Sequence, residues 1–345
     1  MQRIVLIFFT LLATSILVTS ITAESNLGNV GPIDPGMYSL EQVLNRLGNK
    51  PLLHSIDQFD LEKAKMGEDL IFTGYTRVDG KKTKRISDYF VCTDCHNTTR
   101  EFRDASSESS ADRLNYAKEN GLPFLPGSTF WGIYNRTSFY NNDYVEKYED
   151  LVTDARSSLG NSVQLCAEYC SSGRVLKDWE LEAIMHYFKR NELHISDLII
   201  SMEDKMELTK DNLSDNEKSR LSKVITSSYR QAYSATFLET MSREDRPYGD
   251  GGNPEDGKLI YQKACMFCHQ NKRVTYLHLD NGKLSGSLLW RNRKKYTDQS
   301  IYQIVRHGTY SKVGRKQYMP LYTKEKMSDE QLNDLVAYIK QIAKR

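Results

Sequence analysis

The feature that most constrains this chain is a Cys-x-x-Cys-His pattern that occurs twice, at Cys92–His96 and Cys265–His269. Two thiols three positions apart can bond to the two vinyl groups on one edge of a porphyrin, and the adjacent histidine can then bind the iron. A zinc site would need further Cys or His ligands at matching spacing, and the sequence offers none. The pattern predicts two covalent haem c groups, held by Cys92, Cys95, His96, Cys265, Cys268 and His269, with both histidines as iron ligands.

The N-terminus indicates export. One arginine, Arg3, precedes a mostly apolar run from Ile4 to Val18, and small residues then lead to Ala23. This layout predicts a signal peptide at residues 1–23 that is removed after Ala23, while an uncleaved membrane anchor stays open as the alternative. No later stretch is long and apolar enough to cross a bilayer. We therefore expect a periplasmic or otherwise exported protein without a membrane span after cleavage.

The charge of the chain is nearly balanced. There are 47 Lys and Arg against 45 Asp and Glu, a net charge of +2, and no basic stripe stands out. Nucleic acid is therefore excluded as a partner. The partners expected of a haem protein of this kind are redox proteins.

The C-terminal part of the chain has the layout of a small haem domain. A Gly-, Pro- and Asp-rich stretch at 246–257 predicts a linker, and a short helix is expected from Lys258 to Ala264. Ser328 and Gln331 form a capping box before an apolar helical face made of Leu332, Leu335, Val336 and Ile339. A helix, the haem motif, a long loop and a closing helix resemble the class I cytochrome c fold.

The loop before the closing helix offers a sixth iron ligand. Met319, followed by Pro320, holds the position where this family places its ligand, and a thioether is a soft donor suited to haem iron. The competing residues in this region are Met327, His307 and His278.

The first half repeats this plan. Met66–Phe72 matches the opening helix, and a polar insert at Thr76–Asp88 predicts a loop or small hairpin. The closing helix is expected at Lys177–Phe188 with Asp178 as its N-cap. Between the halves, His194–Glu244 is expected to be mostly helical, with a capping box at Ser214 and a face of large apolar residues repeating every four positions, namely Leu221, Ile225, Tyr229, Tyr233 and Phe237.

The predicted fold is mostly α, with two class I cytochrome c-like domains joined by a helical segment. The expected divisions are the signal peptide at 1–23, an N-terminal domain at 24–193, a connector at 194–250 and a C-terminal domain at 251–345.

The sixth ligand of the first haem is left open by spacing alone. The loop before the first closing helix has no usable methionine and presents Cys166 and Cys170 instead. Either cysteine matches the position of Met319 when counted back from the closing helix. A local disulfide between them is the alternative, feasible in an oxidising compartment where the geometry allows it. The first haem would then take another ligand or stay five-coordinate.

A family resemblance selects Cys166. Val163–Cys166, six further residues, Gly173 and then Glu180–Tyr187 resemble the first haem domain of thiosulfate dehydrogenases and the catalytic haem subunit of the sulfur-oxidising Sox complex. The resemblance implies a Cys166 thiolate as ligand of the first haem. It also implies a catalytic role for Cys166 and for Arg136, which lies in the aromatic segment Phe130–Arg136 and would screen the charge of a sulfur anion.

Two classes of function remain open after this comparison. The chain is expected to transfer electrons through two haems, either with turnover of a sulfur anion such as thiosulfate or tetrathionate, or as a pure carrier. A dihaem peroxidase is a weaker third option, since the distal groups it needs cannot be assigned. A thiolate ligand lowers the reduction potential of a haem and a methionine ligand raises it. The first haem is therefore expected to have the lower reduction potential of the two.

Overall fold

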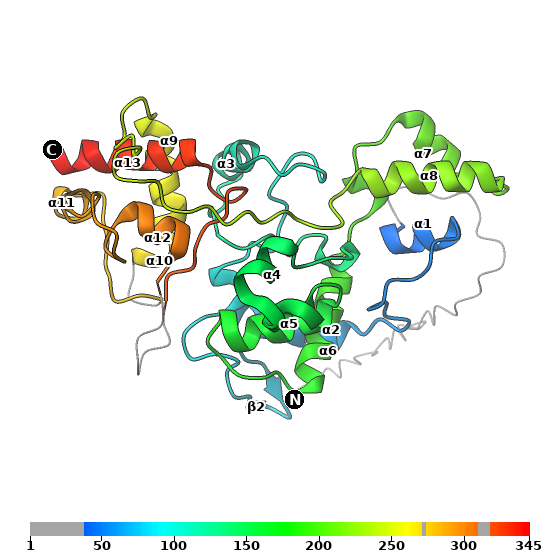
Figure 1. Cartoon of the computed structure of the whole chain (residues 1–345). Coiled ribbons are helices and arrows are strands. Elements are labelled where there is room, and N and C mark those ends of the chain that lie inside the picture. Colours follow the sequence, from blue (N-terminus) through cyan, green and yellow to red (C-terminus); the bar gives the residue numbers. More distant parts are fainter. Residues whose placement is uncertain (1–37, 271–273, 310–317) are drawn as a thin grey trace, which may run out of the picture.

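A computed structural model describes residues 38–270, 274–309 and 318–345. The expected signal peptide at 1–23 lies outside the described residues. The described part is mostly helical, with one two-stranded ribbon. Three groups of helices lie side by side: α1, α7 and α8 at one end, α2, α4, α5 and α6 in the middle, and α9 to α13 at the other end (Figure 1). None of the helices in these described ranges is long and apolar enough to cross a membrane.

The central group is built on two helices that cross. α2 (Leu61–Thr73) begins at Asp60, whose carboxylate accepts from two backbone amides of the first turn, and ends at Gly74 with φ +76°. α2 packs across α6 (Asp178–Arg190). The expected hairpin in the insert after α2 is confirmed as β1 (Arg77–Val78) and β2 (Lys81–Lys82).

The N-cap predicted for α6 is wrong. Lys177 occupies the N-cap position, and Asp178 is the first helical residue. The Glu180 carboxylate accepts from the backbone amide of Lys177 at 2.8 Å, so a side chain inside the first turn satisfies the amide of the N-cap residue, as the third helical residue of a capping box does.

The C-terminal group contains the second Cys-x-x-Cys-His motif. It comprises α9 (Pro254–Ile260), the π-helical turn η6 (Tyr261–Cys265), α10 (Met266–His269), α11 (Lys283–Arg291), α12 (Ile301–His307) and α13 (Asp329–Lys344). α9 begins four residues before the expected Lys258, because Asn253 caps it and Pro254 fits its first position. The predicted capping box is confirmed, with the Ser328 hydroxyl accepting from the Gln331 amide at 3.2 Å.

The third group shares a separate core. α1 (Leu40–Arg46), α7 (Met202–Leu208) and α8 (Asp215–Ser227) bury Leu40, Leu208 and Leu221 together. The prediction that His194–Glu244 is mostly helical is wrong, because no helix follows Ser227 in this segment. Of the predicted apolar face, Tyr229, Tyr233 and Phe237 therefore lie outside any helix. Their rings contact other parts of the chain instead: Phe237 packs edge-on against Tyr144 of α4. The segment after α8 runs back across the molecule to α9 (Figure 1).

The remaining elements are short and come from the first 197 residues of the chain. They are η1 (Cys92–Asp94), α3 (Ser110–Glu119), η2 (Ile133–Asn135), α4 (Asn142–Tyr148), η3 (Glu149–Ala155), α5 (Leu159–Leu165), the π-helical η4 (Cys166–Cys170) and η5 (Ile195–Asp197).

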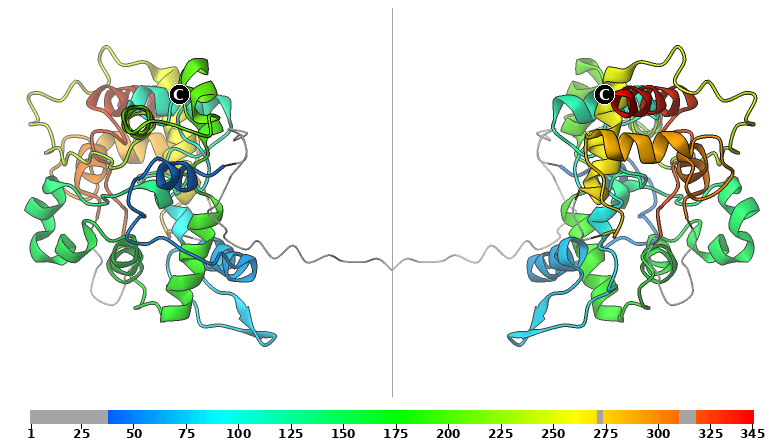
Figure 2. Two further views of the ribbon diagram at one scale, coloured as in Figure 1. Left: turned by 90° about the vertical axis from the view of Figure 1, so that its right-hand side faces the viewer. Right: turned by 90° about the vertical axis from the view of Figure 1, so that its left-hand side faces the viewer.

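Helix α3 belongs by sequence to the first half but packs on the C-terminal group. Leu114 and Ala117 of α3 are buried in the same core as the apolar face of α13. The Gln331 side chain also donates to the Ser110 carbonyl at 2.8 Å. α3 lies beside the start of α13 (Figure 1), and the two further views show the same neighbourhood (Figure 2). The two halves of the chain are therefore joined by buried contacts as well as by the connector.

Each of the two helix crossings has a glycine at the contact point, where no side chain would fit. A Cβ on Gly67 of α2 would fall on the Ala183 carbonyl of α6, and a Cβ on Gly257 of α9 would fall on the Asp334 carbonyl of α13. We expect Gly67→Ala and Gly257→Ala each to lower the free energy of unfolding by about 1–3 kcal/mol, because the helices must move apart.

Denaturant unfolding of the haem-loaded protein measures this effect. The control is Gly160→Ala in α5, where the nearest atom to a new Cβ is 3.7 Å away. Equal stabilities of all three variants would show that the crossings do not require glycine.

Candidate haem sites

The first motif begins with the short 3-10 turn η1, which follows the buried residue Val91 in extended conformation. The Asp94 carboxylate accepts from the Val91 amide at 2.8 Å and shapes η1. The His96 amide then donates to the Cys92 carbonyl at 3.0 Å, which sets His96 directly after the turn. Burial raises the pKa of the Cys92 thiol to about 12, as expected for a thiol in an apolar pocket.

His96 is held in one orientation. Its Nδ1 lies 2.7 Å from the Ser128 carbonyl, and because a carbonyl can only accept, Nδ1 carries the proton and Nε2 keeps its lone pair. The ring stacks on Phe130 at 4.5 Å, and Phe130 packs in turn against Phe188 of α6. Burial lowers the pKa of His96 to about 4, so the imidazole is neutral at neutral pH. A neutral, oriented imidazole with a free Nε2 is what an iron ligand requires.

The second motif has the same arrangement. His269 Nδ1 lies 2.8 Å from the Leu277 carbonyl, which again leaves Nε2 free. Burial lowers the pKa of His269. Burial also raises the pKa of Cys265 to about 12. The orienting partner of each histidine is a backbone carbonyl, so neither partner carries a side-chain signal that the sequence could have shown.

The structure places Met319 next to Thr309. The Met319 amide donates to the Thr309 hydroxyl at 2.7 Å, and the Thr309 amide donates to the Met319 carbonyl at 2.9 Å. Two of the competing ligands are engaged elsewhere. Met327 is 1 % exposed within the C-terminal core, and His307 Nε2 lies 3.5 Å from the Glu239 carboxylate. These placements leave the Met319 assignment as a prediction.

Cys166 and Cys170 come together on η4 with their thiols in hydrogen-bond contact. No disulfide joins these two cysteines. The hydrogen bond between the two thiols raises the pKa of Cys166, and it lowers the pKa of Cys170. Burial, and to a smaller extent the nearby thiols of Cys92 and Cys95, also raise the pKa of Cys166.

Tyrosines surround this thiol pair. Burial, and then the charge of the nearby thiols, raises the pKa of Tyr140, Tyr144 and Tyr318. The Tyr318 hydroxyl donates to the Cys170 carbonyl. This tyrosine precedes the predicted ligand Met319, so the loop of the second site touches η4 of the first. Tyr140 and Tyr144 are neighbours in one segment, but Tyr318 comes from a distant one, and nothing in the sequence pattern indicated that it joins them.

Arg136 is buried and already hydrogen-bonded. Its guanidinium donates to the Thr129 carbonyl at 2.6 Å and lies over the Tyr233 ring at 4.3 Å. Burial lowers the pKa of Arg136. The other arginine near this region, Arg174, forms a two-point ion pair with Glu180 at 2.6 and 2.7 Å. Both guanidiniums therefore have structural contacts independent of any substrate.

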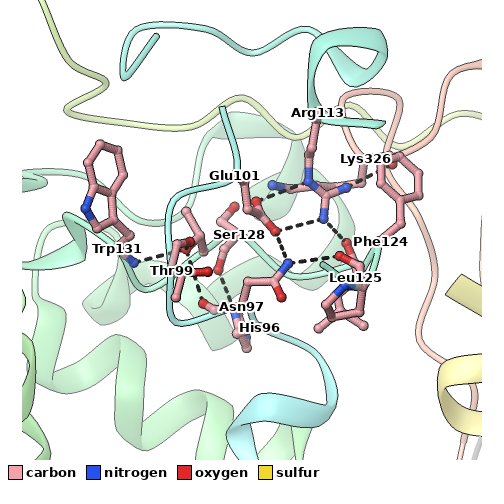
Figure 3. Close-up of polar contacts among 12 residues, drawn as sticks. His96, Asn97, Thr99, Glu101, Arg113, Phe124, Leu125, Ser128, Trp131 and Lys326 are labelled. Atoms are coloured by element: carbon pink, nitrogen blue, oxygen red, sulfur yellow. Dashed lines mark hydrogen bonds and ion pairs between the residues drawn. The ribbon is translucent and has the colours of Figure 1, made fainter. Parts of the chain in front are cut away.

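A buried charged cluster lies behind His96 (Figure 3). Arg113 pairs with Glu101 through two hydrogen bonds of 3.1 Å, and the Asn97 amide donates to the same carboxylate at 2.6 Å. Arg113 also donates to the Lys326 carbonyl at 3.2 Å. Burial alone would raise the pKa of Glu101, but Arg113 and Lys326 hold it below its usual range. Nothing in the local sequence pattern pointed to these residues.

Lys326 gives this cluster a testable pH dependence. Burial, assisted by the charge of Arg113, lowers its pKa from 10.5 to about 7 in the folded protein. Between these values the unfolded chain binds more protons, so the free energy of unfolding rises with pH. We expect Lys326→Met to abolish that rise.

Unfolding measured between pH 7 and 10 tests the prediction. The matched control is Lys324→Met, which removes an exposed lysine two positions away and should keep the rise. A wild-type profile that is flat over this range would contradict the lowered pKa of Lys326 in the folded protein.

The arrangement of a Cys-x-x-Cys-His motif, a carbonyl-oriented histidine and a glycine-dependent helix crossing defines a c-type cytochrome site in the C-terminal group. Residues 252–339 match the family model described as cytochrome C oxidase, cbb3-type, subunit III. The match covers about a quarter of the chain and supports a c-type cytochrome with covalently bound haem that transfers electrons. No curated protein and no solved structure matches the chain.

Among the described residues, no three His, Cys, Asp or Glu side chains gather in a way that could hold a metal ion by themselves.

Proposed function

We propose that the protein is an exported dihaem c-type cytochrome that transfers electrons through two covalent haems. The observation that carries this proposal is the repetition of one design: His96 and His269 each follow a Cys-x-x-Cys pair, and each has Nδ1 bound to a backbone carbonyl. Gly67 and Gly257 allow the same close helix crossing in each half. Export rests on the predicted signal peptide at residues 1–23.

The residues present fit a haem at each motif. Cys92 and Cys95 would bond the first haem and Cys265 and Cys268 the second, with His96 and His269 as proximal ligands. The haems supply reversible one-electron oxidation and reduction. The protein contributes buried, neutral imidazoles with a fixed orientation, and the predicted distal ligands Met319 and Cys166. These ligands would make the second haem the one with the higher potential.

Turnover of a sulfur anion at the first haem is the second function we consider. It is favoured by the family resemblance that implies a Cys166 thiolate as ligand of the first haem, at the start of η4, where Cys166 is in thiol contact with Cys170. The structural contacts of Arg136 and Arg174 favour the pure electron carrier, because the donors that would bind a dianion are already used in part. Redox partner proteins are common to both functions.

The haem count tests the main proposal. We expect two haems per chain in the pyridine haemochrome assay and in the intact mass of the mature protein. The double variant Cys92→Ala, Cys95→Ala should lose one haem and keep the other, because two thioether bonds attach each haem. One haem in the wild type would restrict the cytochrome to the C-terminal part of the chain.

Low-temperature EPR tests the ligand Cys166. The oxidised protein should show a low-spin signal with the narrow g-spread of a thiolate-ligated haem, and Cys166→Met should remove it. Cys170→Ser is the matched control and should keep the signal, since Cys170 is a neighbour of the ligand and not the ligand. A signal that survives in Cys166→Met would remove the basis for thiosulfate and tetrathionate assays.

A further inference from the structure

A short segment links the two motifs, and we call it the strap: residues Pro123–Ser128. On the side of the first motif, the Ser128 carbonyl accepts from His96 Nδ1 at 2.7 Å. The Gly127 amide donates to the Cys95 carbonyl at 2.8 Å. A Cβ on Gly127 would lie 2.6 Å from the His96 ring, so only glycine allows this approach. One end of the strap therefore fixes the histidine of the first motif.

The other end of the strap is bound to the C-terminal group. The Phe124 amide donates at 2.9 Å to the carbonyl of Lys263, two residues before Cys265. The Phe124 carbonyl accepts at 3.1 Å from the hydroxyl of Tyr322, three residues after Met319. The Phe124 ring is fully buried in the C-terminal core. The strap thus touches the segments on both sides of the second haem site.

Arg113 of α3 holds the middle of the strap. Its guanidinium donates to the Leu125 carbonyl, to the Glu101 carboxylate and to the Lys326 carbonyl (Figure 3). Arg113 and Glu101 are 1 % and 2 % exposed, so the ion pair is almost free of water. A planar guanidinium with several acceptors in fixed directions is well suited to hold such a junction.

A second contact, made by Tyr318, joins the two haem sites. The Tyr318 hydroxyl donates to the Cys170 carbonyl, and the Tyr318 ring packs against Phe90 at 5.5 Å, next to the first motif. The loop that precedes Met319 is therefore bound to segments on both sides of the first motif in sequence, Phe90 before it and Cys170 after it.

We propose that the strap fixes the two haems as one rigid pair, so that electrons pass directly between them within a single molecule. Phe124, Gly127 and Arg113 are the positioning residues. In each transfer one iron is oxidised from Fe(II) to Fe(III) and the other is reduced from Fe(III) to Fe(II), with no bond made or broken. The inference rests on the proposed function, because it requires both haems. It assigns the coupling to the strap and to the Arg113 guanidinium that holds its middle.

The experiment compares variants of the haem-loaded protein. Phe124→Ala removes the buried ring that docks the strap, and Leu221→Ala is the control, an equally buried truncation in the third core. Tyr322→Phe is a milder variant that removes one hydrogen bond and keeps the ring, and Tyr229→Phe in the third core is its control. Three readouts are needed: haem content, the Soret circular dichroism, and electron exchange between the haems after flash photoreduction of one of them.

For the wild type we expect two haems, a bisignate Soret signal from coupled porphyrins, and an exchange phase whose rate does not depend on protein concentration. In Phe124→Ala the haem content should stay at two, while the exchange should slow by about tenfold or more because the pair is no longer held in position. Tyr322→Phe should slow the exchange by a smaller factor, and both control variants should exchange electrons at the wild-type rate.

Two results would overturn the inference while leaving two haems in place. One is exchange in the wild type that depends on protein concentration, and the other is exchange in Phe124→Ala as fast as in Leu221→Ala. A single haem in the wild type would overturn the proposed function as well, so the haem count separates the two failures.

Discussion

Each candidate haem site depends on one hydrogen bond, from a histidine Nδ1 to a backbone carbonyl. The Ser128 carbonyl serves His96 and the Leu277 carbonyl serves His269. The bond decides which nitrogen carries the proton and which one is free for iron, and it sets the plane of the ring. Everything that positions these carbonyls, including the strap and the loop after the second motif, thereby positions the ligand.

The helix crossings supply the frame for these bonds. Gly67 and Gly257 let the backbones of the paired helices come into contact, and the buried side chains around the crossings form two separate cores. Helix α3 connects these cores because Leu114 and Ala117 leave the first half and join the C-terminal core. A rigid connection of this kind restricts the relative motion of the two motifs far more than a flexible linker would.

In the charged cluster behind His96, hydrogen bonds and ion pairs offset the cost of burying charged side chains. Glu101 is satisfied by Arg113 and Asn97, and the guanidinium is in turn satisfied by backbone carbonyls of the strap and of Lys326. Removing one partner of such a pair leaves a buried charge uncompensated. The junction between the two halves is therefore specific, since only this arrangement pairs all of these groups.

The sequence by itself determined the two Cys-x-x-Cys-His motifs, the capping box at Ser328 and the helical character of most segments, because these features are local and follow from residue type and spacing. It failed where the decision was made by distant contacts. Lys177 and not Asp178 occupies the N-cap position of α6, with its amide bound to the Glu180 carboxylate. Tyr233 and Phe237 lie outside any helix and pack on other segments. Only the tertiary structure showed the strap, the Arg113–Glu101 pair and the contact of Tyr318 with η4, because backbone carbonyls look alike in every sequence and partners far apart in the chain leave no common pattern.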